Sequence, residues 1–249
     1  MRPVDAHCHL DFEHYEEDRE EVLERCMEEL EFVVNAGTGV EGNRRTVELS
    51  GKYPEFVVPA LGVHPTSVDQ FGELDRIKRQ VRENDPAAVG EIGLDHYHVD
   101  EDAARERQEG VFREMLELAE ELGKPVVVHT RDAEELSVEI LEDFDVDAML
   151  HCFNGTPDLA ERAIQEGMKI GVTTQVLYSD RVRKIAGRIP LEDLLLETDS
   201  PFLYRGERNS PVKVGESAEE IAGLKDRSRE EVVEKTTGNA VRLFLEEEG

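Results

Sequence analysis

Eight short apolar segments, each followed by an amphipathic helical pattern or by a loop leading into one, run along this chain of 249 residues. Such alternation is typical of parallel βα units, because parallel neighbours need a long crossover connection. The expected strands are residues 4–7, 31–36, 56–62, 87–91, 125–130, 147–151, 168–172 and 194–198. Eight units of this kind in about 250 residues predict an α/β protein with a (β/α)8 TIM barrel.

A doubly wound open sheet is the alternative arrangement of alternating strands and helices. It would carry a glycine-rich phosphate loop after its first strand, and none follows residues 4–7. No linker rich in Pro, Gly or Ser and no shift of composition divides the chain. We therefore expect residues 1–249 to form a single barrel domain.

Polar residues mark several helix starts. Thr156, which is followed by a proline, predicts an N-cap. Ser217 and Ser228 each stand three residues before a glutamate, the spacing of a capping box. Two closing helices are therefore expected after the last strand.

Two histidines, His7 and His9, stand two residues apart at the end of the first expected strand. Side chains with this spacing on an extended chain point to the same face, so both imidazoles can reach one metal ion. A second such pair, His96 and His98, lies in the acidic loop after Asp95, which shows that the spacing alone is weak evidence.

Other side chains able to bind metal stand at the downstream ends of other expected strands. They are Glu91, His129, His151 and Asp199, from the fourth, fifth, sixth and eighth strands. The active sites of (β/α)8 barrels lie at the carboxyl ends of the strands, so these groups should converge with the first histidine pair. Four imidazoles and two carboxylates suit two divalent ions with one bridging carboxylate. Two ions about 3.5–4 Å apart can activate a water and stabilise a leaving oxygen.

The charge balance is strongly acidic, with 58 Asp and Glu against 29 Lys and Arg. Molar salt shortens the Debye length to about 3 Å and screens the resulting repulsion, so we expect a halophilic, salt-adapted protein. This composition disfavours nucleic-acid binding through a broad basic patch. Any phosphate of a substrate must be held locally, by metal ions and a few Arg or His.

The cysteines Cys8, Cys26 and Cys152 show no CxxC spacing, which argues against a disulfide framework or a zinc ribbon. Cys8 and Cys152 adjoin candidate histidines, but strand alternation predicts that they face away from the site, buried between strand and helix. No apolar run approaches the roughly 18 residues of a membrane span, and the start of the chain lacks a signal-peptide core. We expect a cytoplasmic protein without membrane contact.

Nine segments carry a resemblance to a known family over nearly the whole chain. They are DAHCHLD at 5–11, LGVHP at 61–65, GEIGLD at 90–95, QEGVF at 108–112, KPVVVHTRDA at 124–133, HCFNG at 151–155, ETDSPFL at 197–203, RNSP at 208–211 and TGNAVRLF at 237–244. In their order and spacing, the chain resembles the TatD-type metal-dependent deoxyribonucleases, a branch of the amidohydrolase-like barrel superfamily.

The resemblance implies roles for the matching residues. His7, His9 and Asp199 would bind one metal ion, His129 and His151 would bind the other, and Glu91 would bridge the two. Glu91 and Asp199 would be the catalytic carboxylates, and Asp199 would orient or deprotonate the attacking water.

Three further residues are expected at the same mouth. His64 and Arg131 are assigned to the substrate phosphate, which an arginine can bind through two oxygens at once. A supporting role or a surface ion pair is the alternative for both. Glu197, two residues before Asp199, is expected to partner a histidine that binds metal.

The function predicted from these residues is a two-metal hydrolase of phosphodiester bonds that trims DNA from an end. A metal-dependent deacylase or amidase, such as a D-aminoacyl-tRNA deacylase, is one alternative, because the same metal pair activates water against carbonyls. A non-catalytic metal-binding interaction protein is the other. The ions could be zinc, magnesium or manganese, since histidines favour the first and carboxylates allow the others. No obligate protein partner is inferred.

The sequence departs from the usual family pattern at three loop positions. Ser210 stands where an acidic residue is usual, Tyr204 replaces a proline, and His96 replaces an aromatic residue. These loops border the expected substrate site, so they leave the substrate preference open and the metal ligands unaffected.

Overall fold

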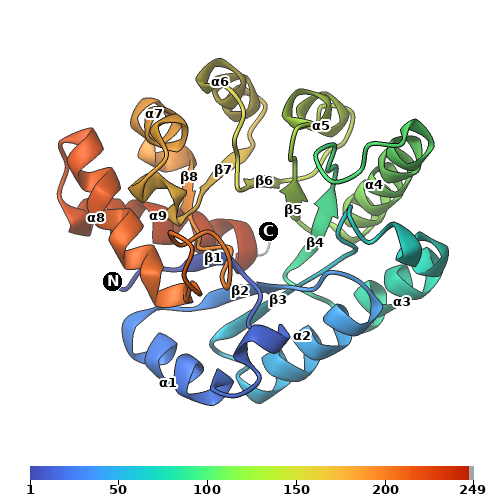
Figure 1. Ribbon diagram of the computed structural model, residues 1–249, viewed down its shortest axis with the longest axis horizontal. Helices are drawn as coiled ribbons and strands as arrows, with labels where there is room; N and C mark the ends of the chain where they lie inside the picture. Colours follow the sequence, from blue (N-terminus) through green and yellow to red (C-terminus); the bar gives the residue numbers. More distant parts are fainter. Residues whose placement is uncertain (247–249) are drawn as a thin grey trace.

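Eight parallel strands follow one another in sequence order around a central axis in the computed structural model, which describes residues 1–246 (Figure 1). The strands are β1 (Asp5–Cys8), β2 (Val33–Ala36), β3 (Val57–Leu61), β4 (Ala88–Gly93), β5 (Val126–His129), β6 (Ala148–His151), β7 (Lys169–Val172) and β8 (Leu194–Leu196). The (β/α)8 barrel expected from the sequence is confirmed. Residues 247–249 of the predicted domain lie outside the described residues.

The helices form an outer ring around the strands (Figure 1). The α-helices are α1 (Arg19–Glu29), α2 (Val40–Lys52), α3 (Leu74–Asn84), α4 (Asp102–Leu122), α5 (Glu134–Leu141), α6 (Pro157–Gln165), α7 (Asp180–Arg188), α8 (Val214–Lys225) and α9 (Arg229–Phe244). Short 3-10 segments are η1 (Glu13–Tyr15), η2 (Val68–Glu73), η3 (Thr174–Leu177), η4 (Leu191–Asp193) and η5 (Pro211–Lys213). None of the helices in residues 1–246 has the length and apolarity that a membrane crossing requires.

Two of the three predicted helix caps are confirmed. The Thr156 hydroxyl accepts the Leu159 N–H at the start of α6, and the Ser228 hydroxyl accepts the Glu231 N–H at the start of α9. The prediction for Ser217 is wrong, because α8 begins three residues earlier and buries this serine inside the helix. Its capping-box spacing arose by coincidence within a continuous helix.

The ring closes between β1 and the segment that follows β8. The Asp199 N–H donates to the His7 carbonyl at 3.0 Å, and the His9 N–H donates to the Ser200 carbonyl at 2.8 Å. Asp5 at the start of β1 accepts the Thr198 N–H at 2.8 Å and the Thr198 hydroxyl at 2.5 Å. These bonds place Asp199 directly beside the first histidine pair, although 190 residues separate them in the chain.

Small and branched apolar side chains fill the barrel below the site. One buried cluster contains Ala36, Ala60, Val127, Met149 and Leu195 from the strands, with Ala240 and Phe244 of α9 packed against it. Met149 and Leu195 each precede a polar residue of the site by two positions, so strand alternation turns both sets inward. The polar groups therefore stand on an apolar floor at the carboxyl end of the barrel.

Candidate metal centre

The six predicted metal ligands converge at the carboxyl end of the barrel, and their donor atoms lie close together. His7 is the second-to-last residue of β1, and His9 follows the strand directly. Their Nε2 atoms are 3.1 Å apart, and the Oδ1 atom of Asp199 lies 3.7 Å and 3.4 Å from them. These three residues form one group of possible ligands, with ligand atoms within 4.8 Å of one another.

Glu91 stands at the centre of the remaining donors. Its Oε2 atom lies 3.5 Å from the Nε2 atoms of both His7 and His9. Its Oε1 atom lies 2.9 Å from Nδ1 of His129 and 3.8 Å from Nε2 of His151. Each oxygen of this carboxylate thus faces a different set of imidazoles, the geometry that a bridging ligand needs. The strand also extends two residues beyond Glu91, so the expected strand end at this position is wrong.

His129 and His151 lie farther from each other than a shared ion would suggest. Their ring centroids are 6.1 Å apart. The ring of His151 stacks on His7 at 3.6 Å, whereas His129 makes an edge contact with His64 at 4.5 Å. Two further donor groups follow from this arrangement, one made of His7, Glu91 and His151 and one made of His64, Glu91 and His129.

Burial raises the pKa of the Glu91 and Asp199 carboxyl groups, and the neighbouring histidines lower it. Burial opposes ionisation of Glu91, but His64 and His7 outweigh it and hold the pKa of the carboxyl well below its usual range. The pKa of Asp199 is also lowered against the effect of burial, through its hydrogen bond with His9. Both groups are therefore carboxylates at neutral pH, the form that binds metal.

The histidines divide into two kinds. Burial lowers the pKa of His7 and of His151, so both are neutral and hold a lone pair for a metal. Burial also opposes the charge of His9 and His129, but their carboxylate partners raise the pKa of each to about 9. Protons on these two rings balance the negative charge of the site, and a divalent ion would displace them.

The donor set fits a metal centre on an observation independent of the spacing. The Oε2 atom of Glu91 is buried and accepts no hydrogen bond within the described residues. An ionised buried oxygen without a donor is costly unless a cation compensates it. A divalent ion on the side that faces His7 and His9 would compensate this oxygen.

Glu197 and Asp95 contact the second ring nitrogen of His151 and of His129, respectively. Oε2 of Glu197 lies 2.6 Å from Nδ1 of His151, and the Glu197 side chain is fully buried. Oδ2 of Asp95 lies 3.0 Å from Nε2 of His129 and 2.9 Å from Nδ1 of His98. Such contacts fix the orientation of a ring that binds metal. The sequence reasoning did not assign Asp95, although it closes the GEIGLD segment four residues after Glu91.

The two residues expected to bind phosphate lie at the mouth in different ways. His64 is partly buried, and its Nε2 atom lies 3.3 Å from Oε1 of Glu91. Arg131 is exposed, and its guanidinium lies 4.2 Å from the centre of the Tyr97 ring. Among the described residues it makes no ion pair with a carboxylate, unlike most basic residues of this protein.

The expectation for Cys152 is wrong, and that for Cys8 is confirmed. Cys8 is fully buried on β1, where its thiol points to the Val34 carbonyl. Cys152 comes after the end of β6 with a φ of 48°, so strand alternation no longer sets its direction. Its side chain lines the cavity at the barrel mouth, next to His151.

This cavity, the mouth pocket, has a volume of about 350 Å³ and opens beside the candidate ligands. It is lined by His129, His151 and Asp199 together with Arg131, Arg181 and Asn154, among other residues. Like Arg131, Arg181 pairs with no carboxylate in the described part of the chain, and it donates instead to the Asn154 carbonyl. The pocket therefore joins the candidate metal centre to two available cations.

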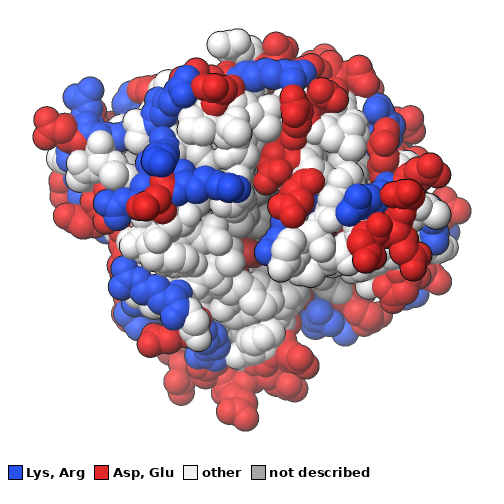
Figure 2. Space-filling model, turned by 45° about the horizontal axis from the view of Figure 1, so that its top comes forward, with Lys and Arg blue, Asp and Glu red and all other residues white. Residues whose placement is uncertain are grey.

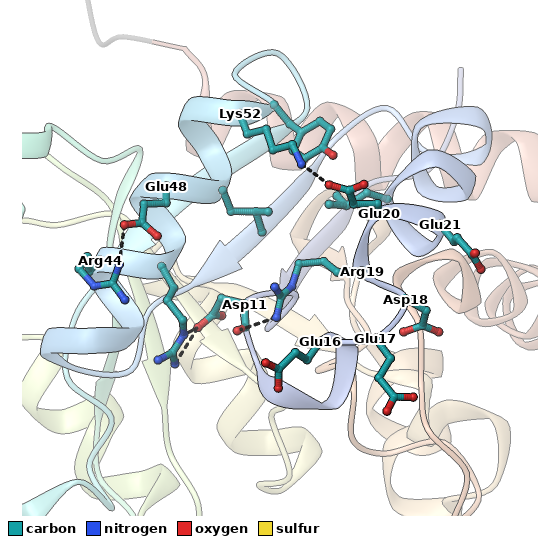
Figure 3. A pocket seen from close by; sticks show the side chains of 14 residues that line it. Asp11, Glu16, Glu17, Asp18, Arg19, Glu20, Glu21, Arg44, Glu48 and Lys52 are labelled. Carbon is teal, nitrogen blue, oxygen red and sulfur yellow. Dashed lines mark hydrogen bonds and ion pairs between the residues drawn. The ribbon is translucent and has the colours of Figure 1, made fainter.

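A larger cavity of about 650 Å³ lies on the outside of the barrel, along α1 and α2 (Figure 3). Some of its charged side chains pair with one another, as in the contacts of Arg44 with Glu48 and of Lys52 with Glu20. Asp11 joins it to the site, because Asp11 accepts from Arg45 and from Asn35, and Asn35 accepts the Leu10 N–H. Among the described residues, none of the groups of possible metal ligands lies in this cavity.

Comparison with known proteins agrees with this geometry. The family described as TatD related DNase matches residues 4–245. The chain belongs to the TatD family. It is thereby a metal-dependent hydrolase on a (β/α)8 barrel, as the motifs predict.

Individual relatives match almost end to end. An uncharacterized metal-dependent hydrolase of Methanocaldococcus jannaschii is 37% identical over 98% of this chain and 97% of its own length. Human deoxyribonuclease TATDN3 is 32% identical over 97% of this chain and 94% of its own. The crystal structure of YJJV, a TatD homolog from Escherichia coli, superimposes with a TM-score of 0.88 at 29% identity and covers 99% of both chains.

Proposed function

We propose that this protein hydrolyses phosphodiester bonds at DNA ends with two divalent metal ions, in the cytoplasm of a salt-adapted cell. The position of Glu91 carries the metal part of this proposal, because its two oxygens face separate groups of imidazoles. The human relative named a deoxyribonuclease supports DNA as the substrate.

The ligand roles follow the two oxygens of Glu91. His7, His9 and Asp199 form one group of donor atoms beside Oε2 and would hold one ion. His129 and His151 lie in different donor groups but both approach Oε1, and they would hold the other ion. Bound divalent ions would supply a water acidic enough to act as nucleophile near neutral pH and positive charge beside the phosphate. Zinc, magnesium and manganese all suit this set of nitrogen and oxygen donors.

Asp199 is placed to control the attacking water. It is an ionised carboxylate at the edge of the mouth pocket, with its Oδ1 atom aimed at the imidazoles. A carboxylate there can accept a hydrogen bond from water and so direct the oxygen lone pair toward phosphorus. Its low pKa makes orientation the larger part of its role and proton removal the smaller part.

His64 and Arg131 would bind the phosphate oxygens. The Thr66 N–H donates to Nδ1 of His64, so the ring hydrogen of the neutral form is on Nε2, the nitrogen that faces the site. His64 is therefore a hydrogen-bond donor toward the substrate. Arg131 can donate to two phosphate oxygens at once, and no carboxylate among the described residues competes for it.

The charge of the chain favours a salt-rich environment. A net charge of −29 repels DNA at low ionic strength, and molar salt removes most of this repulsion. Local contacts at the mouth must then provide the binding of the substrate.

A cleavage assay tests the proposal. End-labelled single-stranded DNA is incubated with the full chain at high salt with Zn²⁺, Mg²⁺ or Mn²⁺, or with a chelator, beside an aminoacyl ester. Metal-dependent shortening of the DNA from one end is the expected result. Cleavage of the ester alone would instead show a deacylase, and metal binding without turnover of either substrate would show a binding protein.

A further inference from the structure

Large apolar side chains are exposed at only a few places in the described chain, and these places are not scattered. They are Met1, Tyr97, Tyr178, Phe202 and Leu245. Met1 and Leu245 stand at the two ends of the described chain. The other three follow β4, β7 and β8, at the end of the barrel that carries the candidate metal centre. Exposed aromatic rings grouped at one mouth mark a binding surface.

Charged residues do not cover the whole of this side of the molecule. Figure 2 shows a face with a hollow near its centre and many uncharged residues around it, with Lys and Arg along its upper left, a run of Asp and Glu from the upper edge toward the hollow, and further Asp and Glu at the right and lower margins. Because the whole chain carries a charge of −29, long-range attraction cannot draw a polyanion to it. A contact that does not depend on charge is needed.

Phe202 is held at a fixed distance from the candidate centre. Its N–H donates to the Asp199 carbonyl at 2.9 Å, and its carbonyl accepts from the Asn209 side chain at 2.7 Å. Its ring makes an edge contact with Phe12 at 6.0 Å, and Phe12 in turn stacks on His9 at 4.6 Å. Two ring contacts therefore connect a surface aromatic to a candidate metal ligand.

Tyr97 repeats this arrangement on the opposite side of the ring of strands. Its N–H donates to Asp95, the carboxylate that holds His129. Its ring lies under the guanidinium of Arg131, and more than half of the side chain is exposed. The guanidinium covers one face of the ring, and the exposed remainder of the side chain leaves room for a base beside a cation that suits its phosphate.

We propose that Phe202 and Tyr97 are positioning residues that stack on the nucleobases on either side of the phosphodiester at the metal centre. This inference rests on the proposed nuclease function and deepens it. Every base has a π-face, so the contact selects nucleotides over other phosphate esters without selecting a base sequence. Bases must be unpaired to reach both rings, so the substrate end is single-stranded or frayed.

The test compares Phe202→Ala, Tyr97→Ala and Phe202→Trp with the wild-type protein and with the control Leu245→Ala, which removes an exposed apolar side chain far from the mouth. The substrates are an end-labelled oligodeoxynucleotide and the same strand with base-free residues beside the cleaved linkage. Each alanine variant should lose roughly 5- to 100-fold in kcat/KM on the normal strand, mainly through KM. Phe202→Trp and Leu245→Ala should match the wild type.

Two further measurements separate stacking from a general structural effect. The base-free strand should be a poor substrate for the wild type, and Phe202→Ala should cause little additional loss on it. A strand with 2-aminopurine at the end and phosphorothioate linkages should lose fluorescence on binding to the wild type, and much less on binding to either alanine variant.

Several results would overturn the inference. Wild-type cleavage and wild-type quenching that both alanine variants retain would remove any role in stacking. If the variants instead convert a dimer to a monomer in light scattering and cleave DNA normally, the rings are a contact between copies of the chain. A wild type that cleaves no oligonucleotide and quenches no probe would overturn the nuclease proposal as well, whereas cleavage without an effect of the variants would overturn the stacking alone.

Discussion

His151 and Glu197 form a buried pair in which Nδ1 of the imidazole lies 2.6 Å from Oε2 of the carboxylate. The other oxygen of Glu197 accepts the Cys152 N–H at 2.6 Å. The Glu197 side chain fits here because the neighbouring residue of β7 is Gly171. A Cβ atom at Gly171 would lie only 2.5 Å from Oε1 of Glu197. The pair turns Nε2 of His151 toward Glu91 and Asp199.

Glu197→Gln should therefore disturb His151 without changing the volume of the site. The amide oxygen must accept the Cys152 N–H, which leaves the amide N–H₂ facing Nδ1 of His151. The imidazole then carries its hydrogen on Nε2 and cannot use that nitrogen as a ligand. We expect a loss of roughly 10- to 100-fold in metal affinity or activity, measured by metal titration and DNA cleavage. The control Glu192→Gln changes an exposed carboxylate, and equal metal affinity in both variants would contradict the role of Glu197.

The barrel and the position of its site were predictable because they depend on periodicity. Strand alternation and the rule that barrel sites lie at carboxyl ends are enough to bring His7, Glu91 and His151 together. Strand ends were less predictable, as Glu91 shows, because β4 continues for two residues beyond it. Where a strand stops depends on pairing with its neighbours, which a single segment does not encode.

Residues beyond the strands were the hardest to place. Cys152 adopts a left-handed backbone conformation directly after β6, so alternation gave the wrong side. Asp95 and Tyr97 lie in the loop after β4, where Asp95 contacts His129 and His98 and accepts the Tyr97 N–H. The contact of Asp95 with His129 joins elements 34 residues apart in the sequence, so no local pattern reports it.

Glu91→Ala and Asp199→Ala should each abolish hydrolysis and leave the barrel folded. Both side chains lie above the apolar floor of the barrel, so removing them takes away charge from the site and little packing from the core. Activity should fall by at least about 10³-fold, because the ions lose a ligand and the water loses its orientation. End-labelled single-stranded DNA reports activity, and circular dichroism reports the fold. Wild-type cleavage by either variant would refute the mechanism.

Arg131→Ala should distinguish a phosphodiester substrate from a carboxylic ester. The guanidinium stands at the mouth pocket without a carboxylate partner among residues 1–246, so its loss removes a contact with phosphate. We expect kcat/KM for DNA to fall roughly 10- to 100-fold, as for the loss of one or two charge-assisted hydrogen bonds. The control Arg79→Ala removes an exposed arginine of α3. Equal losses on DNA and on an aminoacyl ester would favour a general role in the site.

Asp18 and Arg208 should make stability depend on pH in the acid range. Their side chains form a two-point ion pair, with distances of 2.8 Å and 2.5 Å, between the loops that follow β1 and β8. The hydrogen bond from Arg208 lowers the pKa of Asp18 in the folded protein, so the stabilisation is present above pH of about 4 and is lost as pH falls further. Asp18→Asn should lower the free energy of unfolding by only about 0.5 kcal/mol at pH 6, because both side chains are partly exposed. Urea unfolding at several pH values should show this difference shrinking below pH 4, and Glu17→Gln should show no such trend.

Salt should stabilise this protein more than it stabilises a typical cytoplasmic enzyme. At a net charge of −29, like charges repel across the whole surface, and the Debye length falls from about 30 Å at 0.01 M to about 3 Å at 1 M. Relief of about 2 kcal/mol would raise the melting temperature by roughly 4–8 °C. Calorimetry in KCl from about 0.01 M to about 1 M measures this rise. Sucrose serves as the uncharged control. A melting temperature that stays constant in KCl, or that rises equally in sucrose, would show that repulsion does not limit the stability and would remove the argument for salt adaptation.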